Sequence, residues 1–220
     1  MSGGPSSAPS SRRQHAVEAF GNAASAIGPV TLGMSWFGLT RGEFSMLDAG
    51  QHVITEVVAA SRRPVHASLW TWCISDYEQE PVSAWMANGL ILTATLIIDR
   101  SAEQRSAPTI ASWRSRFGMQ SVKVIKNHAK ICRVWNDEYH VLLRGSCNWN
   151  FNPRCEQMDI TEGCPAFSLV ARIEDELPIL PPNCSNLEAD TATSLGRAFE
   201  QSTLQMFRGV REWSIGPRTK

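Results

Sequence analysis

Residues His128 to Glu156, with the sequence HAKICRVWNDEYHVLLRGSCNWNFNPRCE, decide how the rest of the chain is interpreted. The stretch begins with His128-x-Lys130 and continues as an apolar run. A strand in this place would put His128 and Lys130 on one face, because successive side chains of a strand point to opposite sides. Ala129 and Ile131 would then face a core.

A polar turn and a second strand are predicted to follow. Residues 135–138 are turn-like, and residues 139–144 have the composition of a returning strand. The hairpin would bring the Gly-Ser-x-Asn run at residues 145–148 back beside His128. An imidazole, an ammonium, a hydroxyl and a carboxamide would then meet at one place, which suits the binding and attack of a phosphodiester.

This motif resembles the signature of the phospholipase D superfamily, which includes lipases, phosphodiesterases and metal-independent nucleases. The specific match spans residues 128–156, and an α/β pattern extends it back to about Met34. The family's usual acid, five residues after the lysine, is replaced here by Trp135. Single-motif members often rely on a later glutamate instead. The residues that carry the resemblance are His128, Lys130, Gly145, Ser146, Asn148 and Glu156.

The resemblance implies a metal-independent phosphodiesterase that forms a phosphohistidine. His128 would attack phosphorus, while Lys130 and Asn148 would hold the nonbridging oxygens. Glu156 would fix the tautomer of the imidazole, and Ser146 would be a supporting hydroxyl. The reaction uses two motif histidines and this chain has one such motif, so we expect a symmetric homodimer with a composite site.

Basic residues around the motif indicate an anionic substrate. From Gln104 to Asn136 there is no Asp or Glu, although seven basic residues lie in that range. A basic block of this kind favours nucleic acid, DNA or RNA, over a solvated helix and strand face. The residues expected to bind substrate are Lys126, Arg133, Asn150 and Arg154.

Two alternatives to a nuclease stay open at this point. A catalytically inactive nucleic-acid-binding protein on the same fold would follow if Trp135 had removed an essential acid. A phospholipase would need an apolar entrance or an amphipathic membrane face, and the sequence shows neither convincingly. The sequence does not separate DNA from RNA or single strands from duplexes.

Composition is consistent with one globular domain and no cofactor. The chain has 220 residues, 43% hydrophobic residues and zero formal net charge. The six cysteines are irregularly spaced and no secretory signal is recognisable, so we expect reduced thiols, a cytoplasmic location and no metal. No apolar run approaches the roughly 20 residues of a membrane span, which predicts no membrane partner.

The order of elements predicts an α/β fold, a mixed β-sheet flanked by helices. We expect a tail at 1–15, the α/β domain at 16–175, an acidic, proline-rich linker at 176–186, a helix at 187–213 and a tail at 214–220. Within the domain, the pattern predicts strands at 34–39, 65–74, 90–99 and 158–160, and helices at 45–60, 77–88 and 101–116, the last with Pro108 inside it.

Two tryptophans of the strand at 65–74 share a spacing that has two interpretations. Trp70 and Trp72 lie two residues apart and would share one face of a strand. They could stack on a nucleobase. Burial in the core is the expectation, since tryptophan is highly buried on average.

Overall fold

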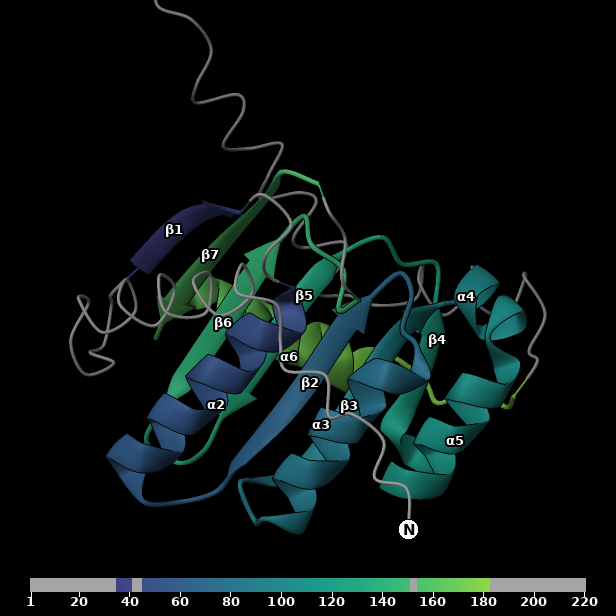
Figure 1. Ribbon diagram of the computed structural model, residues 1–220, viewed down its shortest axis with the longest axis horizontal. Helices are drawn as coiled ribbons and strands as arrows, with labels where there is room; N and C mark the ends of the chain where they lie inside the picture. Colours follow the sequence, from purple (N-terminus) through teal and green to yellow (C-terminus); the bar gives the residue numbers. More distant parts are fainter. Residues whose placement is uncertain (1–34, 41–44, 151–153, 183–220) are drawn as a thin grey trace, which may run out of the picture.

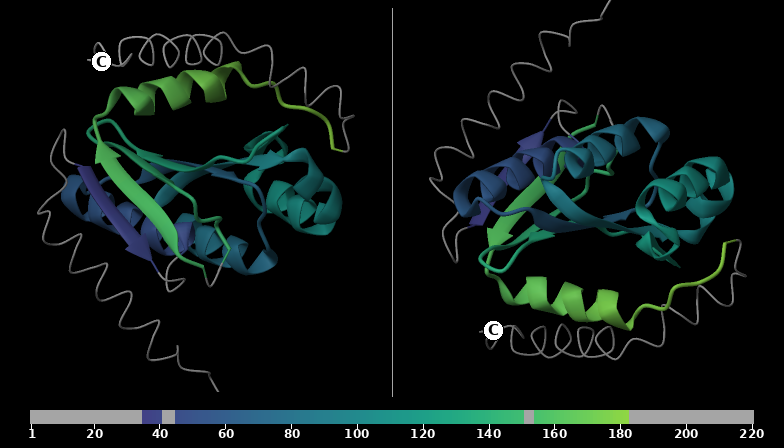
Figure 2. Two further views of the ribbon diagram at one scale, coloured as in Figure 1. Left: turned by 90° about the horizontal axis from the view of Figure 1, so that it is seen from above. Right: turned by 90° about the horizontal axis from the view of Figure 1, so that it is seen from below.

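The computed structural model describes residues 35–40, 45–150 and 154–182. Its centre is a seven-stranded sheet in the order β1-β7-β6-β5-β2-β3-β4, with helices on both faces (Figures 1 and 2). The strands are β1 Ser35–Thr40, β2 Val65–Thr71, β3 Ile91–Asp99, β4 Val122–Ile125, β5 Lys130–Trp135, β6 His140–Gly145 and β7 Glu156–Glu162. The helices are α2 Met46–Ser61, α3 Asp76–Ala87, α4 Arg100–Arg105, α5 Ala107–Phe117, the short 3-10 turn η1 Met119–Ser121, and α6 Pro165–Glu176.

The sheet is mixed, as the sequence predicts. Strands β2, β3 and β4 run parallel, and β5 joins them antiparallel to β2. Strands β5, β6, β7 and β1 form an antiparallel series, with β1 at one edge of the sheet. Because β2, β3 and β4 are parallel, their carboxyl ends meet at one edge, where loops are free to carry polar groups.

The hairpin of the motif forms as expected. Lys130 pairs with Gly145 and Trp135 pairs with His140, so the Gly-Ser-x-Asn run leaves β6 next to the beginning of β5. One detail differs: β5 begins at Lys130, so His128 lies in the loop before it. Ala129 is therefore exposed and does not face the core, because strand alternation has not yet started at that point.

Local signals place most helix ends correctly. Ser45 is the N-cap of α2 and forms a capping box with Asp48. Gly89, which has φ +69°, follows the end of α3. The single helix expected over 101–116 is instead two helices that meet at Ser106. Pro108 lies in the first turn of α5, where its missing N–H costs nothing.

Each face of the sheet has its own core. Helices α2, α3 and α5 cover one face, and α6 covers the opposite one (Figure 2). The first core contains Trp113 and Trp149, both 0% exposed. In the second, Trp70 and Ile97 of the sheet pack against α6 through Phe167, Val170 and Ile173. The expected fold class is confirmed. The proposed tails, the end of the linker at 183–186 and the helix at 187–213 lie outside the described residues.

Candidate functional site

The site lies at the carboxyl end of β2, between the loop that precedes β5 and the loop that follows β6. Asn127 fixes the first loop: its side chain donates to the carbonyls of Thr71 at 3.0 Å and Ile97 at 3.3 Å. Its backbone N–H donates to Asp99 at 2.8 Å, and its side-chain oxygen accepts from the Ala129 N–H at 2.8 Å. His128 is thereby held between two anchored residues. No sequence pattern pointed to Asn127.

Lys130 lies directly against His128. Its Nζ is 3.1 Å from Nδ1 and 3.3 Å from Nε2 of the imidazole, and donates to the His128 carbonyl at 2.6 Å. His128 is exposed, whereas Lys130 is only 7% exposed. Burial lowers the pKa of Lys130, and the nearby Cys73 and Glu156 partly oppose that shift. The expected pairing of imidazole and ammonium is present.

Ser146 and Glu156 form a second polar pair beside the lysine. The Ser146 hydroxyl donates to the Glu156 carboxylate and accepts from the Gln157 N–H at 3.0 Å. Glu156 is 8% exposed, and its charge lies close enough to Lys130 to oppose part of the lowering of the lysine pKa by burial. The hydroxyl therefore positions a carboxylate next to the ammonium. The predicted role of Glu156 in fixing the imidazole tautomer stays a prediction.

The two asparagines lie close to residues of the β2 end. Asn148 Oδ1 is 3.5 Å from the Thr71 hydroxyl, and Asn150 Oδ1 is 3.5 Å from the Cys73 thiol. The Asn148 carbonyl accepts from Met46 N–H at 3.4 Å, so the first turn of the 16-residue helix α2 lies beside the motif. The N-terminal end of a helix carries partial positive charge, which favours an anion nearby.

The prediction that Arg133 binds substrate is wrong, because its side chain does not face the site. It is 5% exposed, on the α6 face of the sheet, where it forms an ion pair with Glu174. Lys130 and Arg133 are three residues apart in one strand, and alternation sends their side chains to opposite faces. The other two predicted cations, Lys126 at the end of β4 and Arg154 just before β7, are exposed.

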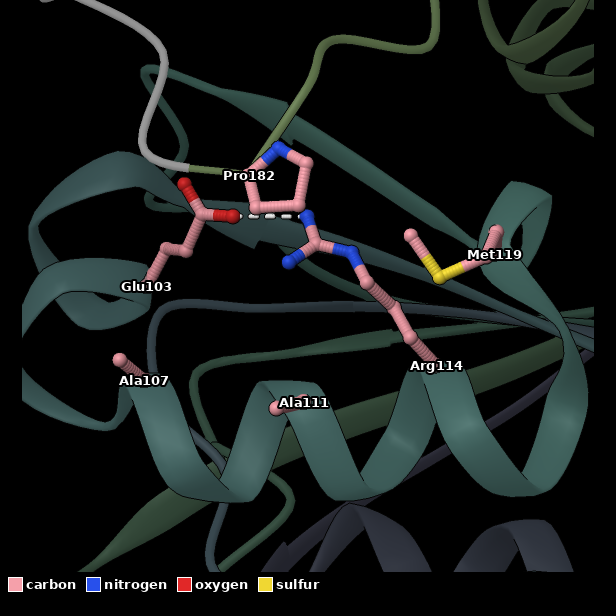
Figure 3. Close-up of a pocket in the computed structure, with 6 residues that line it drawn as sticks. All are labelled: Glu103, Ala107, Ala111, Arg114, Met119 and Pro182. Carbon is pink, nitrogen blue, oxygen red and sulfur yellow. Dashed lines mark hydrogen bonds and ion pairs between the residues drawn. The ribbon is translucent and has the colours of Figure 1, made fainter.

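Much of the predicted basic block is engaged in interactions with other residues of the chain. Arg114 pairs with Glu103 at 2.7 Å beside a cavity of about 270 Å³, which Ala107, Ala111, Met119 and Pro182 also line (Figure 3). Arg116 pairs with Glu80 at 2.7 Å, and Lys123 donates to the Glu174 carbonyl. The block is therefore not a continuous substrate surface.

The structure separates the two tryptophans that were expected to share a face. Trp70 is 3% exposed in the second core and donates to Glu174 at 2.7 Å. Because β2 ends at Thr71, Trp72 leaves the strand and is only partly buried. Its ring centroid lies 6.2 Å from that of His128, and the Arg105 Cζ lies 4.6 Å from its centroid. The expected burial is thus right for Trp70 and wrong for Trp72.

The fold and the motif geometry lead to a family resemblance. His-x-Lys and Gly-Ser-x-Asn meet across one hairpin, with a buried glutamate beside them, on a mixed sheet between helices. The chain resembles the phospholipase D superfamily. No cluster of three metal-ligating side chains is present among residues 35–40, 45–150 and 154–182. No helix in the described ranges is both long and apolar enough to cross a membrane.

Comparison with known proteins adds two remote structural likenesses. No family model matches the chain, and no curated protein does. It is similar to polyphosphate kinase from Porphyromonas gingivalis, with TM-score 0.46 and 13% identity over 69% of this chain and 27% of that one. It is also similar to phosphatidylserine synthase from Haemophilus influenzae Rd KW20, with TM-score 0.44 and 13% identity over 82% of this chain and 46% of that one. The chain thus spans less than half of either protein.

Proposed function

We propose that the chain is a metal-independent phosphodiesterase of the nuclease type, with His128 as nucleophile. The observation that carries the proposal is the Lys130 ammonium, which lies within 3.3 Å of both imidazole nitrogens while its pKa is lowered by burial. Asn148 Oδ1 lies 3.5 Å from the hydroxyl of Thr71, and the carbonyl of Thr71 accepts from Asn127, the residue before His128. An anionic diester that met His128 would find the Lys130 ammonium nearby.

The reaction would proceed in two displacements. A nitrogen of neutral His128 attacks phosphorus, a P–N bond forms, and the bond to the leaving oxygen breaks. A second, protonated imidazole gives its proton to that oxygen. The same imidazole then takes a proton from water as the water attacks the phosphohistidine, which restores His128. In both steps the Lys130 ammonium neutralises charge on the nonbridging oxygens, and the Asn148 amide donates hydrogen bonds to them.

Among the described residues no second histidine lies beside His128, so the proposal takes the second imidazole from another copy of the chain. Three other histidines lie in the described ranges, and each is engaged elsewhere. Nδ1 of His66 forms a hydrogen bond of 2.8 Å with the Thr93 hydroxyl, and the His140 ring stacks on that of Phe167 with 4.9 Å between the centroids. His52 lies in α2, where burial lowers its pKa. His128, by contrast, is exposed at the end of the sheet. A two-fold axis near His128 would bring two imidazoles to one phosphate.

A mixing experiment tests this proposal. Labelled DNA, labelled RNA and vesicles of a choline lipid are incubated with wild type in the presence of excess chelator, and we expect cleavage of nucleic acid alone. His128→Ala should abolish turnover. When wild type and His128→Ala exchange freely at equal amounts, about a quarter of dimers keep both histidines, so activity per wild-type chain should fall to about half.

The matched control is His140→Ala, which removes an exposed histidine far along β6. Mixing it with wild type should leave activity unchanged. Full activity from a protein that stays monomeric by light scattering would overturn the composite site. Binding of nucleic acid without cleavage would instead favour the inactive binding protein, the alternative that follows from Trp135 in place of the family's acid.

A further inference from the structure

We infer that Trp72 is a stacking platform for an unpaired nucleobase, so that the substrate is single-stranded nucleic acid. The inference rests on the proposed function and deepens it, because it concerns the same site. Its basis is a partly exposed tryptophan that lies next to the nucleophile and does not belong to either core.

The position of Trp72 follows from where β2 ends. Thr71, the last residue of the strand, is 0% exposed and its carbonyl accepts from Asn127, which anchors the loop of His128. Trp72 comes next and projects at the same edge of the sheet, with its ring centroid 6.2 Å from that of His128 and an interplanar angle of 54°. A base attached to a phosphate at His128 would therefore lie within reach of the indole.

Arg105 contacts the indole in a way that a base can replace. It lies in the last turn of α4, is exposed, and places its Cζ 4.6 Å from the ring centroid of Trp72. An exposed cation–π contact changes an equilibrium by about 2- to 5-fold. Stacking of a base on an aromatic side chain changes it by about 5- to 150-fold. The base would win this competition, and the released guanidinium would then be available to a phosphate.

Stacking at this position favours single strands over duplexes. A base inside a duplex is already stacked on both faces and paired, and contact with Trp72 would require it to leave the helix. An unpaired base has a free π-face, and every base has one, so little sequence preference is expected. The exposed cations of this edge are Arg105, the last residue of α4, and Lys126, which follows β4, and they suit a phosphate backbone more than a neutral ligand.

Binding is measured in the His128→Ala background, so that cleavage does not interfere. The probes are a single-stranded oligonucleotide, the same oligonucleotide with abasic sites, and its duplex. Trp72→Ala should weaken binding of the base-containing single strand about 5- to 150-fold and leave the abasic strand within about 2-fold. Trp72→Phe should restore most of the affinity, since it keeps an aromatic face. The duplex should bind more weakly than the single strand.

Arg105→Ala and Arg116→Ala form a matched pair, because both arginines are exposed and lie in the last turn of a helix. Arg105→Ala should weaken the abasic strand too and lower the slope of log affinity against log salt by about 0.7. Arg116→Ala, which removes the partner of Glu80, should change neither.

Each outcome decides one of the two claims. Equal loss for base-containing and abasic strands in Trp72→Ala, no loss for either, or tighter binding of the duplex would each overturn the stacking platform. If wild type cleaves no diester but Trp72→Ala shows the base-dependent loss of binding, the proposed catalysis is wrong and the stacking platform stands. Cleavage that requires His128 but is indifferent to Trp72 would do the reverse.

Discussion

Replacing Arg133 with Ala is expected to destabilise the fold by about 3–5 kcal/mol without weakening diester binding per folded molecule. The guanidinium is buried on the α6 face, paired with Glu174, and its Cζ lies 4.4 Å from the ring of Trp135 and 4.5 Å from that of Phe167. The variant would leave the Glu174 carboxylate, which is 7% exposed, without its cation.

The size of the effect follows from what remains around Glu174. Ser68 and Trp70 still donate to it, at 2.5 Å and 2.7 Å, but neither is charged. Burial already raises the pKa of Glu174, and Arg133 is the main group that lowers it. Loss of that cation leaves the buried carboxylate without its ion-pair partner, and Lys123, which donates to the Glu174 backbone carbonyl, does not replace that contact; this is among the costlier single changes. Against a total stability of about 5–15 kcal/mol, this loss is large.

Urea unfolding followed by tryptophan fluorescence measures the change as a lower midpoint at unchanged slope. Arg144→Ala is the control: Arg144 pairs with Asp159 at 2.6 Å, but the two side chains are 41% and 33% exposed, so a cost of about 0–1 kcal/mol is expected. A loss in Arg133→Ala no larger than in Arg144→Ala would refute the reasoning. Weaker diester binding at unchanged stability would restore Arg133 as a substrate ligand.

Two further predictions concern the motif. Gly145→Ala should destabilise the fold by about 1–3 kcal/mol and lower activity, because the new Cβ would lie 2.4 Å from the Gln157 carbonyl oxygen between β6 and β7. Thermal unfolding measures the loss, and Gly89→Ala is the control, because a Cβ there meets no atom within 4 Å and tests backbone strain alone. Equal losses of stability in the two variants would contradict the clash. Burial lowers the pKa of Lys130, and the charged form of the lysine holds the phosphate. As the pH rises, Lys130 should therefore lose its proton, and kcat/KM should fall, at a lower pH than an ordinary lysine would give. Lys130→Arg should move that fall to higher pH, and an unchanged alkaline limb would speak against the role.

The sequence by itself determined features that depend on neighbours along the chain. The period of two around the motif predicted the β5–β6 hairpin, and the hairpin alone brings Lys130 next to Gly145. Ser45 and Gly89 marked helix ends because capping groups and positive φ act within a few residues. The mixed sheet followed from the alternation of strands and helices. The catalytic roles of the motif residues stay predictions.

Only the tertiary structure decided which polar groups are available to a ligand. Arg133 was a reasonable phosphate ligand until α6 placed Glu174 against it, 41 residues away in the chain. Asn127 and Cys73 joined the site through contacts with residues 56 and 77 positions distant, which no local pattern encodes. Trp70 and Trp72 are two residues apart, the spacing of side chains on one face of a strand, but β2 ends at Thr71, between them. Periodicity reports that faces alternate, whereas burial and ion pairing depend on what packs against each face.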